Sequence, residues 1–225
     1  MIGICSRSAM ILLLLAFVEG LPLPTAGAHA DSAALTKSVV WRSDGARYKI
    51  DAGQSHFTVR AFAGGFLSAF AHDHNIAIRD FSGDTDFTYG TVEPASLRMT
   101  IKADSVAIID KVNASDRQKI EGTMRDEVLE ITKYPNIVFK STGVTASKTG
   151  EGQYQAKISG ELTLHGVTRP LTIASQLEFG DKTLRARGAF AIKQSSFDIK
   201  PVSVAGGTIK VKDELKVSFD IVAHP

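Results

Sequence analysis

Two histidines separated by a single residue, His72 and His74, are the side chains in this sequence whose type and spacing could do chemistry. On an extended strand, residues two apart project from the same face, so the two imidazoles would lie together with Asp73 on the opposite face. Counting on by two adds Phe70 and Ile76, which makes the histidine face mostly apolar. Imidazoles on such a face could hydrogen-bond the polar head group of a ligand, bind zinc or copper, or act in acid–base catalysis. They could also simply pack, with backbone carbonyl groups as their hydrogen-bond partners.

A metal site needs more ligands than this pair supplies, because zinc takes three or four protein ligands. Of the other histidines, His56 falls on a polar strand face and His165 lies at a turn with Gly166, and the spacing places neither beside His72. We therefore expect neither a metal site nor a resident cofactor. A zinc- or copper-binding protein, or a metal-dependent enzyme, that uses His72 and His74 is the alternative hypothesis.

No catalytic motif accompanies the histidines. The sequence contains no GxSxG nucleophile elbow, no phosphate-binding loop, no HExxH zinc motif and no EF-hand loop. Arg169, which precedes Pro170, and Arg125 are candidates for an anionic head group, because a guanidinium pairs with a phosphate through two hydrogen bonds. Surface exposure is the simpler explanation for both arginines. The prediction is a protein without catalytic residues.

The composition is that of a globular chain: of 225 residues, 44% are hydrophobic, 22% charged and 8% aromatic. These values exclude collagen-like, low-complexity and wholly disordered chains. Lys and Arg number 26 against 24 Asp and Glu, so the net charge of +2 is too small to indicate nucleic acid as the main partner.

The first thirty residues have the pattern of a signal peptide, with Arg7 ahead of an apolar run at 9–18 and the small-x-small sequence AHA at 28–30. As a helix the ten-residue run would reach only about half of a ~30 Å hydrocarbon core, which argues against a membrane anchor. We predict cleavage after Ala30 and export to an oxidising compartment. The only cysteine, Cys5, would be lost with this segment, so the mature chain would contain no disulfide and no cysteine ligand.

Beyond the leader, residues 31–47 are a mixed polar lead-in and residues 48–225 form the predicted domain. Apolar and polar residues alternate at period two in many of its segments, which predicts strands with one buried and one solvated face and therefore an antiparallel sheet. The clearest segment is 153–164, and the others are 97–102, 184–192 and 215–221, with shorter ones at 57–59 and 171–173.

One stretch, residues 115–134, has a helical rather than a strand period. Ser115 is the expected N-cap, Gly122 weakens the middle and could split the helix, and Pro135 ends it. The amphipathic stripe of this helix consists of Ile120, Met124, Val128 and Ile131.

The predicted fold class is all-β, most simply a closed or nearly closed antiparallel barrel with one helical insertion. A closed barrel has no exposed sheet edge, and about eight strands leave an interior that is either filled by side chains or able to hold one small ligand. A flatter sandwich is also possible. Small inward residues such as Gly160 and Gly188 fit a hollow interior or a close contact between sheets equally well.

The segment 160–173, GELTLHGVTRPLTI, resembles the signature strand pair of the YceI-like family of periplasmic isoprenoid-binding proteins. The segment 48–59 (YKIDAGQSHFTV) is similar to the opening strand of that family, 124–129 to its helix, and 134–142 (YPNIVFKST) to the strand after the helix. The four pieces stand in the order of the family, and the resemblance extends over about residues 48 to 222.

The resemblance implies a periplasmic protein with a lipocalin-like eight-stranded antiparallel barrel around an elongated apolar channel. The channel would hold a polyisoprenoid or similar long-chain lipid, such as a quinone or a prenyl phosphate. The expected function is sequestration or transport of that lipid without covalent chemistry. Two rivals are the metal-dependent protein described above and a barrel without ligand that serves in protein interaction. A homodimer of barrels is a further possibility.

The expected ligand-binding residues are those on apolar strand faces, in the histidine segment and in the signature hairpin. They are Phe57, Phe66, Phe70, His72, His74, Phe87, Phe139, Leu162, Arg169, Phe190 and Phe219.

Overall fold

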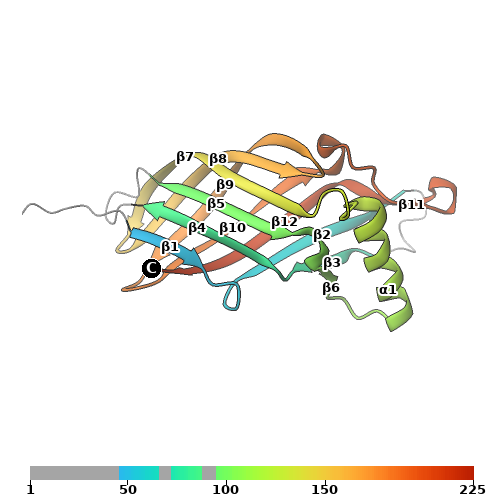
Figure 1. The fold of residues 1–225 in the computed structure, drawn as a ribbon, viewed down its shortest axis with the longest axis horizontal. Helices are drawn as coiled ribbons and strands as arrows, with labels where there is room; N and C mark the ends of the chain where they lie inside the picture. The colour runs from blue at the N-terminus through green and yellow to red at the C-terminus, as the bar shows by residue number, and fades with distance from the viewer. Residues whose placement is uncertain (1–45, 66–71, 88–94) are drawn as a thin grey trace, which may run out of the picture. The chain divides into compact units, whose positions relative to one another are not determined.

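The computed structural model describes residues 46–65, 72–87 and 95–225, and every structural statement below concerns these residues (Figure 1). The predicted signal peptide, most of the lead-in, Phe66 and Phe70 lie outside them.

Eight strands, each antiparallel to its neighbours, close into a ring. The ring closes where Lys49 and Ile50 lie opposite His224 and Ala223, so the predicted eight-stranded antiparallel barrel is confirmed. In ring order the strands are β1 (Ala46–Ile50), β4 (Phe81–Phe87), β5 (Ser96–Lys102), β7 (Asn136–Gly150), β8 (Gln153–Leu164), β9 (Val167–Phe179), β10 (Leu184–Lys193) and β12 (Ile209–His224).

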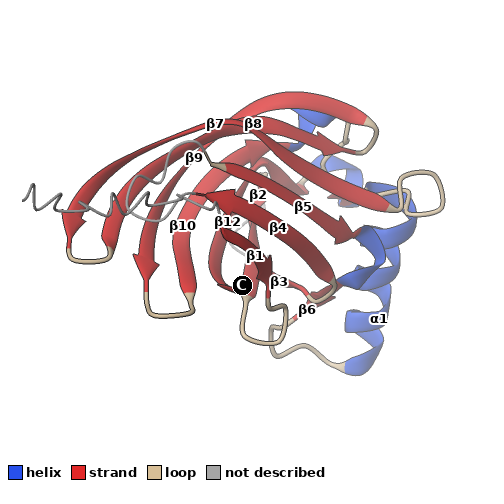
Figure 2. Ribbon diagram, turned by 60° about the vertical axis from the view of Figure 1, so that its left-hand side comes forward, coloured by secondary structure: helices blue, strands red, loops and turns tan. Residues whose placement is uncertain are grey.

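Strand β12 shares one edge between two partners. Its C-terminal end pairs with β1, and the stretch from Lys210 to Asp220 pairs with β2 (His56–Gly64). Three further strands extend the sheet at that end of the barrel: β2 pairs with β3 (His74–Ile78), β3 pairs with β6 (Val106–Ile108), and β11 (Ser203–Val204) pairs with the start of β12. In Figures 1 and 2 the helix α1 lies at this end of the barrel, away from the C-terminus.

The turn between β1 and β2 is fastened to the closing strand by a buried serine. Ser55, only 4% exposed, accepts a hydrogen bond from the backbone N–H of Val222 at 2.9 Å and donates one to the carbonyl of Asp51 at 2.6 Å. The first and last strands of the ring are therefore joined by a side chain as well as by backbone pairing.

Two inward-facing glycines receive aromatic rings from neighbouring strands. A Cβ on Gly160 would lie 2.5 Å from Cζ of Phe139, and a Cβ on Gly188 would lie 2.6 Å from Cζ of Phe219. The rings come from adjacent strands of the same sheet, so these glycines make room for neighbouring side chains and do not mark a contact between two sheets.

The helix starts two residues earlier than the predicted cap implies. Helix α1 spans Ala114–Thr123, and its N-cap is Asn113, whose Oδ1 accepts a hydrogen bond from the backbone N–H of Asp116 at 2.8 Å. The predicted cap at Ser115 is wrong, because asparagine caps a helix as well as serine does and stands two residues earlier.

The predicted end of the helix at Pro135 is also wrong. The helical path continues through Gly122 without a break, widens into a π-helical turn over Met124–Val128 (η3) and stops at Leu129. It stops there because the next residue, Glu130, takes a left-handed backbone conformation with φ of 45°.

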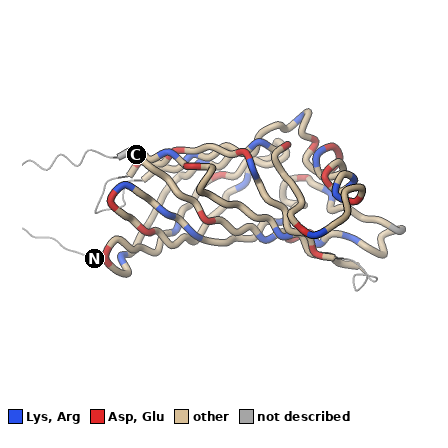
Figure 3. The backbone as a smooth tube through the Cα atoms, turned by 90° about the horizontal axis from the view of Figure 1, so that it is seen from below, with Lys and Arg blue, Asp and Glu red and all other residues tan. Residues whose placement is uncertain are grey.

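Acidic and basic residues are interspersed along the strands (Figure 3), and several form pairs across them. Asp220 of β12 binds Arg185 at 2.6 Å and Arg187 at 3.2 Å, both on β10. The hydrogen bond from Arg185 is the main cause that lowers the pKa of the Asp220 carboxyl to about 2.

Replacement of that carboxylate, Asp220→Asn, is expected to change the acid sensitivity of the fold. Because the folded-state pKa is depressed, the stabilisation is present above the unfolded pKa of about 3.9 and is lost as the pH falls through about 2. After discount for solvent screening, we expect the variant to lose about 1 kcal/mol of unfolding free energy at pH 7 and almost none at pH 2. Urea unfolding at both pH values measures this. An equal loss at both would contradict it, and Asp181→Asn, at an exposed turn, is the control.

Candidate functional site

The barrel contains a cavity of about 520 Å³ whose walls are almost entirely aliphatic and aromatic. This volume lies within the ~300–1,000 Å³ that small-molecule sites usually have. The helical segment contributes to the wall, because Ile120, Met124 and Val128 of the predicted apolar stripe all face the cavity. The few lining residues with a polar side chain are His74, Thr85, Lys119, Thr123 and Gln194.

Most of the residues proposed from the sequence line this cavity. His74 is one of them, and the others are Phe57, Phe87, Phe139, Leu162, Phe190 and Phe219.

The other proposed residues that the structure describes do not line the cavity. His72 precedes β3, is exposed and does not line the cavity. Arg169 is also exposed, and its guanidinium donates to the backbone carbonyl of Ser196 at 3.0 Å. Arg125 lies in a shallow outer groove beside β6. Phe66 and Phe70 lie outside the described residues.

The end of the cavity nearer the C-terminus is packed with aromatic rings. The Phe87 ring lies 4.9 Å from that of Tyr48 and 4.8 Å from that of Phe179, and Phe179 meets Tyr154 edge-on at 5.5 Å. Such offset and edge-to-face pairs are the favourable arrangements of aromatic side chains. This end therefore offers a bound molecule mainly apolar contacts.

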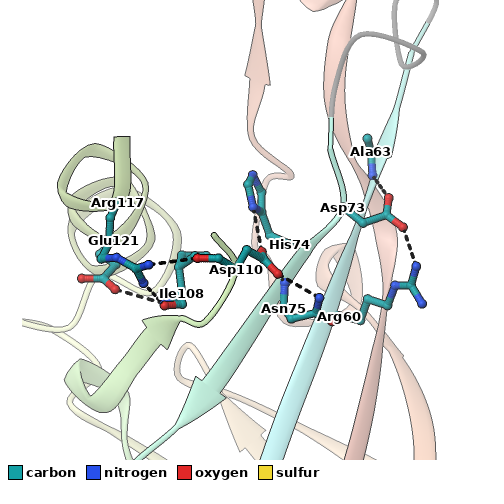
Figure 4. Close-up of polar contacts among 9 residues, drawn as sticks. All are labelled: Arg60, Ala63, Asp73, His74, Asn75, Ile108, Asp110, Arg117 and Glu121. Atoms are coloured by element: carbon teal, nitrogen blue, oxygen red, sulfur yellow. Dashed lines mark hydrogen bonds and ion pairs between the residues drawn. The ribbon is translucent and has the colours of Figure 1, made fainter. Parts of the chain in front are cut away.

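At the helix-bearing end, β3 places His74 in the cavity wall together with Ile76 and Ile78, as the alternation at period two predicts. The intervening side chains point away, and Asp73 on the other face binds Arg60 at 2.9 Å (Figure 4).

The imidazole of His74 is held by a carboxylate that comes from another part of the chain (Figure 4). Nδ1 of His74 lies 3.2 Å from Oδ2 of Asp110, and the two oxygens of Asp110 each accept a hydrogen bond from Asn75 at 2.9 Å. Burial raises the pKa of Asp110, but the hydrogen bonds from Asn75 and His74 outweigh it and hold that pKa below its usual value. An ionised carboxylate only accepts hydrogen bonds, so Nδ1 is the donor and Nε2 is left for another partner.

Helix α1 is fixed to the edge strand β6 by two side chains (Figure 4). Arg117 donates to the backbone carbonyls of Ile108 and Asp110, and Glu121 accepts from the backbone N–H of Ile108 at 3.0 Å. These bonds satisfy backbone groups that an edge strand would otherwise leave open. They also set the helix against the end of the cavity.

The segment after the helix is fixed to the barrel by a second contact. Oε2 of Glu130 lies 2.6 Å from Nε2 of His165, and Nδ1 of His165 lies 3.2 Å from the backbone carbonyl of Phe197. Among the described residues, three other than glycine have left-handed backbones: Glu130, His165 and Asp198, the residue after Phe197. Backbone strain of this kind persists only where the surroundings hold it in place.

A double-mutant cycle would measure how much the contact between Glu130 and His165 stabilises the fold. Glu130→Ala is expected to cost about 1 kcal/mol of unfolding free energy, and His165→Ala about 3 kcal/mol because the mostly buried ring also packs against Tyr134. Since the two residues interact directly, the double variant should cost about 1 kcal/mol less than the sum of the single variants. Additive costs in denaturant unfolding would show that the contact contributes nothing.

The arrangement does not favour the metal hypothesis. Over residues 46–65, 72–87 and 95–225, no three potential ligands of the His, Cys, Asp and Glu types gather in one place. His72 and His74 do not face a common point, because His72 is exposed while His74 lines the cavity.

Four polar contributors to this end of the cavity were not predicted from the sequence: Asp110, Lys119, Thr123 and Gln194. The spacing of Lys119 and Thr123 contained a signal, because residues four apart on a helix share a face and these two lie directly beside Ile120 and Met124 of the apolar stripe. No signal marks Asp110 as the partner of His74, since 36 positions separate them.

A closed eight-stranded barrel around an apolar cavity, with an oriented histidine at one end, defines a lipocalin-like barrel of the kind that encloses small molecules. The protein-family model of the YceI-like domain matches residues 48–223 of this chain. The chain therefore belongs to the YceI-like family.

Curated relatives agree with this assignment. The UPF0312 protein of Pseudomonas putida strain W619 is 30% identical over 127 residues, which cover 56% of this chain and 59% of that protein. Protein YceI of Shigella flexneri is 30% identical over 128 residues, 54% of this chain and 61% of that protein. The matched region thus spans about three-fifths of each relative.

Solved structures share the fold. BcnA of Burkholderia cenocepacia superposes with a TM-score of 0.57 at 19% identity and covers 77% of this chain and 98% of that one. A polyisoprenoid binding domain from Saccharophagus degradans gives a TM-score of 0.55 at 14% identity, over 79% of this chain and 97% of that one. None of the helices within residues 46–65, 72–87 and 95–225 combines the length and the hydropathy that a membrane-spanning helix needs.

Proposed function

We propose that this protein binds an isoprenoid-type amphiphile, such as a quinone or a prenyl phosphate, in its barrel and carries or sequesters it in the periplasm without catalysis. The observation that carries the proposal is the cavity of about 520 Å³ with an almost wholly apolar wall. Membership of the YceI-like family and the fold shared with a polyisoprenoid binding domain support it.

The physical basis is burial of hydrocarbon. A prenyl chain makes no hydrogen bonds, so its affinity comes from removing apolar surface from water, worth ~25 cal/mol per Å². For a tail of about 40 carbon atoms, ~0.3 kcal/mol per atom sets a limit on the order of 12 kcal/mol before further costs. Phe57, Phe139, Phe190 and Phe219, all in the cavity wall, would supply much of the contact.

Export is part of the proposal. The N-terminal pattern would direct the chain across the inner membrane and be removed after Ala30. N-terminal sequencing of the protein recovered from the periplasm of an expressing bacterium tests this. The expected first residue is Asp31, and a full-length product retained in the cytoplasm would overturn it.

Native mass spectrometry after mild purification tests the function. The proposal expects a non-covalently retained hydrocarbon of several hundred daltons that organic extraction removes. A stoichiometric metal without lipid would instead support the metal-dependent alternative.

The extracted protein provides a second measurement. A prenyl lipid at about 100 times its Kd should stabilise it by ~2.7 kcal/mol, measured as a rise in Tm. An empty protein whose Tm does not respond to quinones, prenyl alcohols or prenyl phosphates would overturn the proposal and leave a barrel without ligand.

A further inference from the structure

Four of the five lining residues with polar side chains gather at one end of the cavity. Register places His74 of β3 opposite Ala61 of β2, and Ala61 opposite Leu215 of β12. Leu215 in turn lies opposite Ile192 of β10, two residues before Gln194. These strands therefore bring His74 and Gln194 to the same level of the barrel.

Helix α1 brings Lys119 and Thr123 to the same end of the barrel. Its Arg117 and Glu121 bind Ile108, which lies opposite Ile76, two residues from His74. Lys119 and Thr123 belong to the same turns of helix and line the cavity. The exception is Thr85, which lies on β4 opposite Tyr48 at the aromatic end.

Lys119 lines the cavity and is also exposed to solvent, it has no paired carboxylate among the described residues, and three carboxylates of this region have other partners. Asp110 binds His74 and Asn75, Glu121 binds the backbone of Ile108, and Asp116 accepts from the side chain of Asn113 at 2.7 Å. Its ammonium group is therefore free to pair with a charge brought by a ligand.

His74 offers a second polar group at the same place. Its Nδ1 donates to Asp110, which fixes the plane of the ring and leaves Nε2 without a partner among the described residues. Nε2 can accept a hydrogen bond from a hydroxyl when the ring is neutral or donate one to an anion when it is protonated.

We propose that the ligand enters this cavity in one orientation, its tail against the aromatic end and an anionic head group, phosphate or carboxylate, between Lys119 and His74. Lys119 is then the residue that selects an anionic head over a neutral one, and His74 positions the head. The inference rests on the proposed function, since it assigns a direction and a charge preference to the same lipid.

Three probes with one tail test it: geranylgeranyl phosphate, geranylgeranoic acid and geranylgeraniol, titrated calorimetrically at neutral pH. The native protein should bind at least one of the two anions about tenfold more tightly than the alcohol, because a charge-assisted hydrogen bond is about twice as strong as a neutral one. Comparison of phosphate with carboxylate identifies which anion the site prefers. Lys119→Met should reduce the preference to about twofold by weakening the anions alone, and Lys119→Arg should keep it.

Two further variants separate position from net charge. Lys111→Met removes an exposed lysine that does not line the cavity and should leave the preference unchanged. His74→Asn keeps a donor toward Asp110 but removes Nε2, and should weaken all probes with a polar head several-fold. Circular dichroism and Tm confirm that each variant is folded.

Equal affinity of the native protein for all three probes, or an undiminished anion preference in Lys119→Met, would overturn this inference and leave the proposed function standing. Failure of the native protein to bind any of the three would overturn both.

Discussion

Ala186→Trp is expected to weaken binding of a long isoprenoid about 50-fold while the barrel stays folded. Ala186 of β10 lines the cavity, opposite Leu177 and Ile221 on the neighbouring strands. An indole at this position would occupy space that the tail needs. Displacement of about three CH₂ groups, at ~0.8 kcal/mol each, costs about 2.4 kcal/mol of binding free energy.

The control is Ala189→Trp, three residues further along the same strand. Ala189 is exposed, so its indole would point into solvent and leave the affinity unchanged. Both variants should be titrated with a tail of 40 carbons and one of 15, because a shortened cavity penalises the longer tail more. Equal affinity of Ala186→Trp and the native protein for the long tail would show that the tail does not lie in this part of the cavity.

Gly160→Val is expected to cost about 3 kcal/mol of unfolding free energy, or roughly 9 °C of Tm. A Cβ at this position would lie 2.4 Å from the backbone carbonyl of Lys140 and 2.5 Å from Cζ of Phe139. The backbone of the adjacent strand cannot move aside without loss of ladder hydrogen bonds, so the substitution forces strain into β7 and β8.

Gly143→Val is the matched control, because Gly143 lies on the same strand pair and a Cβ there would meet nothing within 4 Å. Its expected cost is below about 0.5 kcal/mol, since valine suits a strand and the position is exposed. Denaturant unfolding of both variants measures the difference. Similar costs would mean that loss of glycine in the strand, and not the contact with Phe139, determines the effect.

Strands whose two faces differ were predictable from the sequence. The predicted segment 153–164 coincides with β8, because alternation at period two continues along its whole length. Strands β3 and β6 carry much weaker signals, since they are short and many of their residues are apolar on both faces. Their place in the sheet depends on pairing with distant segments, which spacing does not encode.

The helix shows where local signals compete. Its apolar stripe was readable, and Ile120, Met124 and Val128 line the cavity. Its ends were not, because Asn113 and Ser115 are both acceptable caps and only the fold decides between them. The stop before Pro135 depends on Glu130, whose left-handed backbone accompanies a contact with His165 from a distant hairpin.

The candidate site was also predictable only in part. Aromatic residues on apolar strand faces were predicted to be inward, and those described line the cavity. His72 differs from His74 because β3 begins only at His74, and the sequence contains no mark of that boundary. The pairing of His74 with Asp110 and the free charge of Lys119 arise only when β3, β6 and α1 are brought together.

The closure of the barrel between β1 and β12 has a consequence for the order in which the chain folds. Ser55 binds Val222 where the barrel closes, and the two residues are 167 positions apart. The ring therefore cannot be completed until nearly the whole domain has been synthesised. Contacts of such long range form slowly. A nascent chain therefore lacks the closing pairs between β1 and β12 until its last residues are made, and its apolar faces stay accessible to water and to chaperones until then.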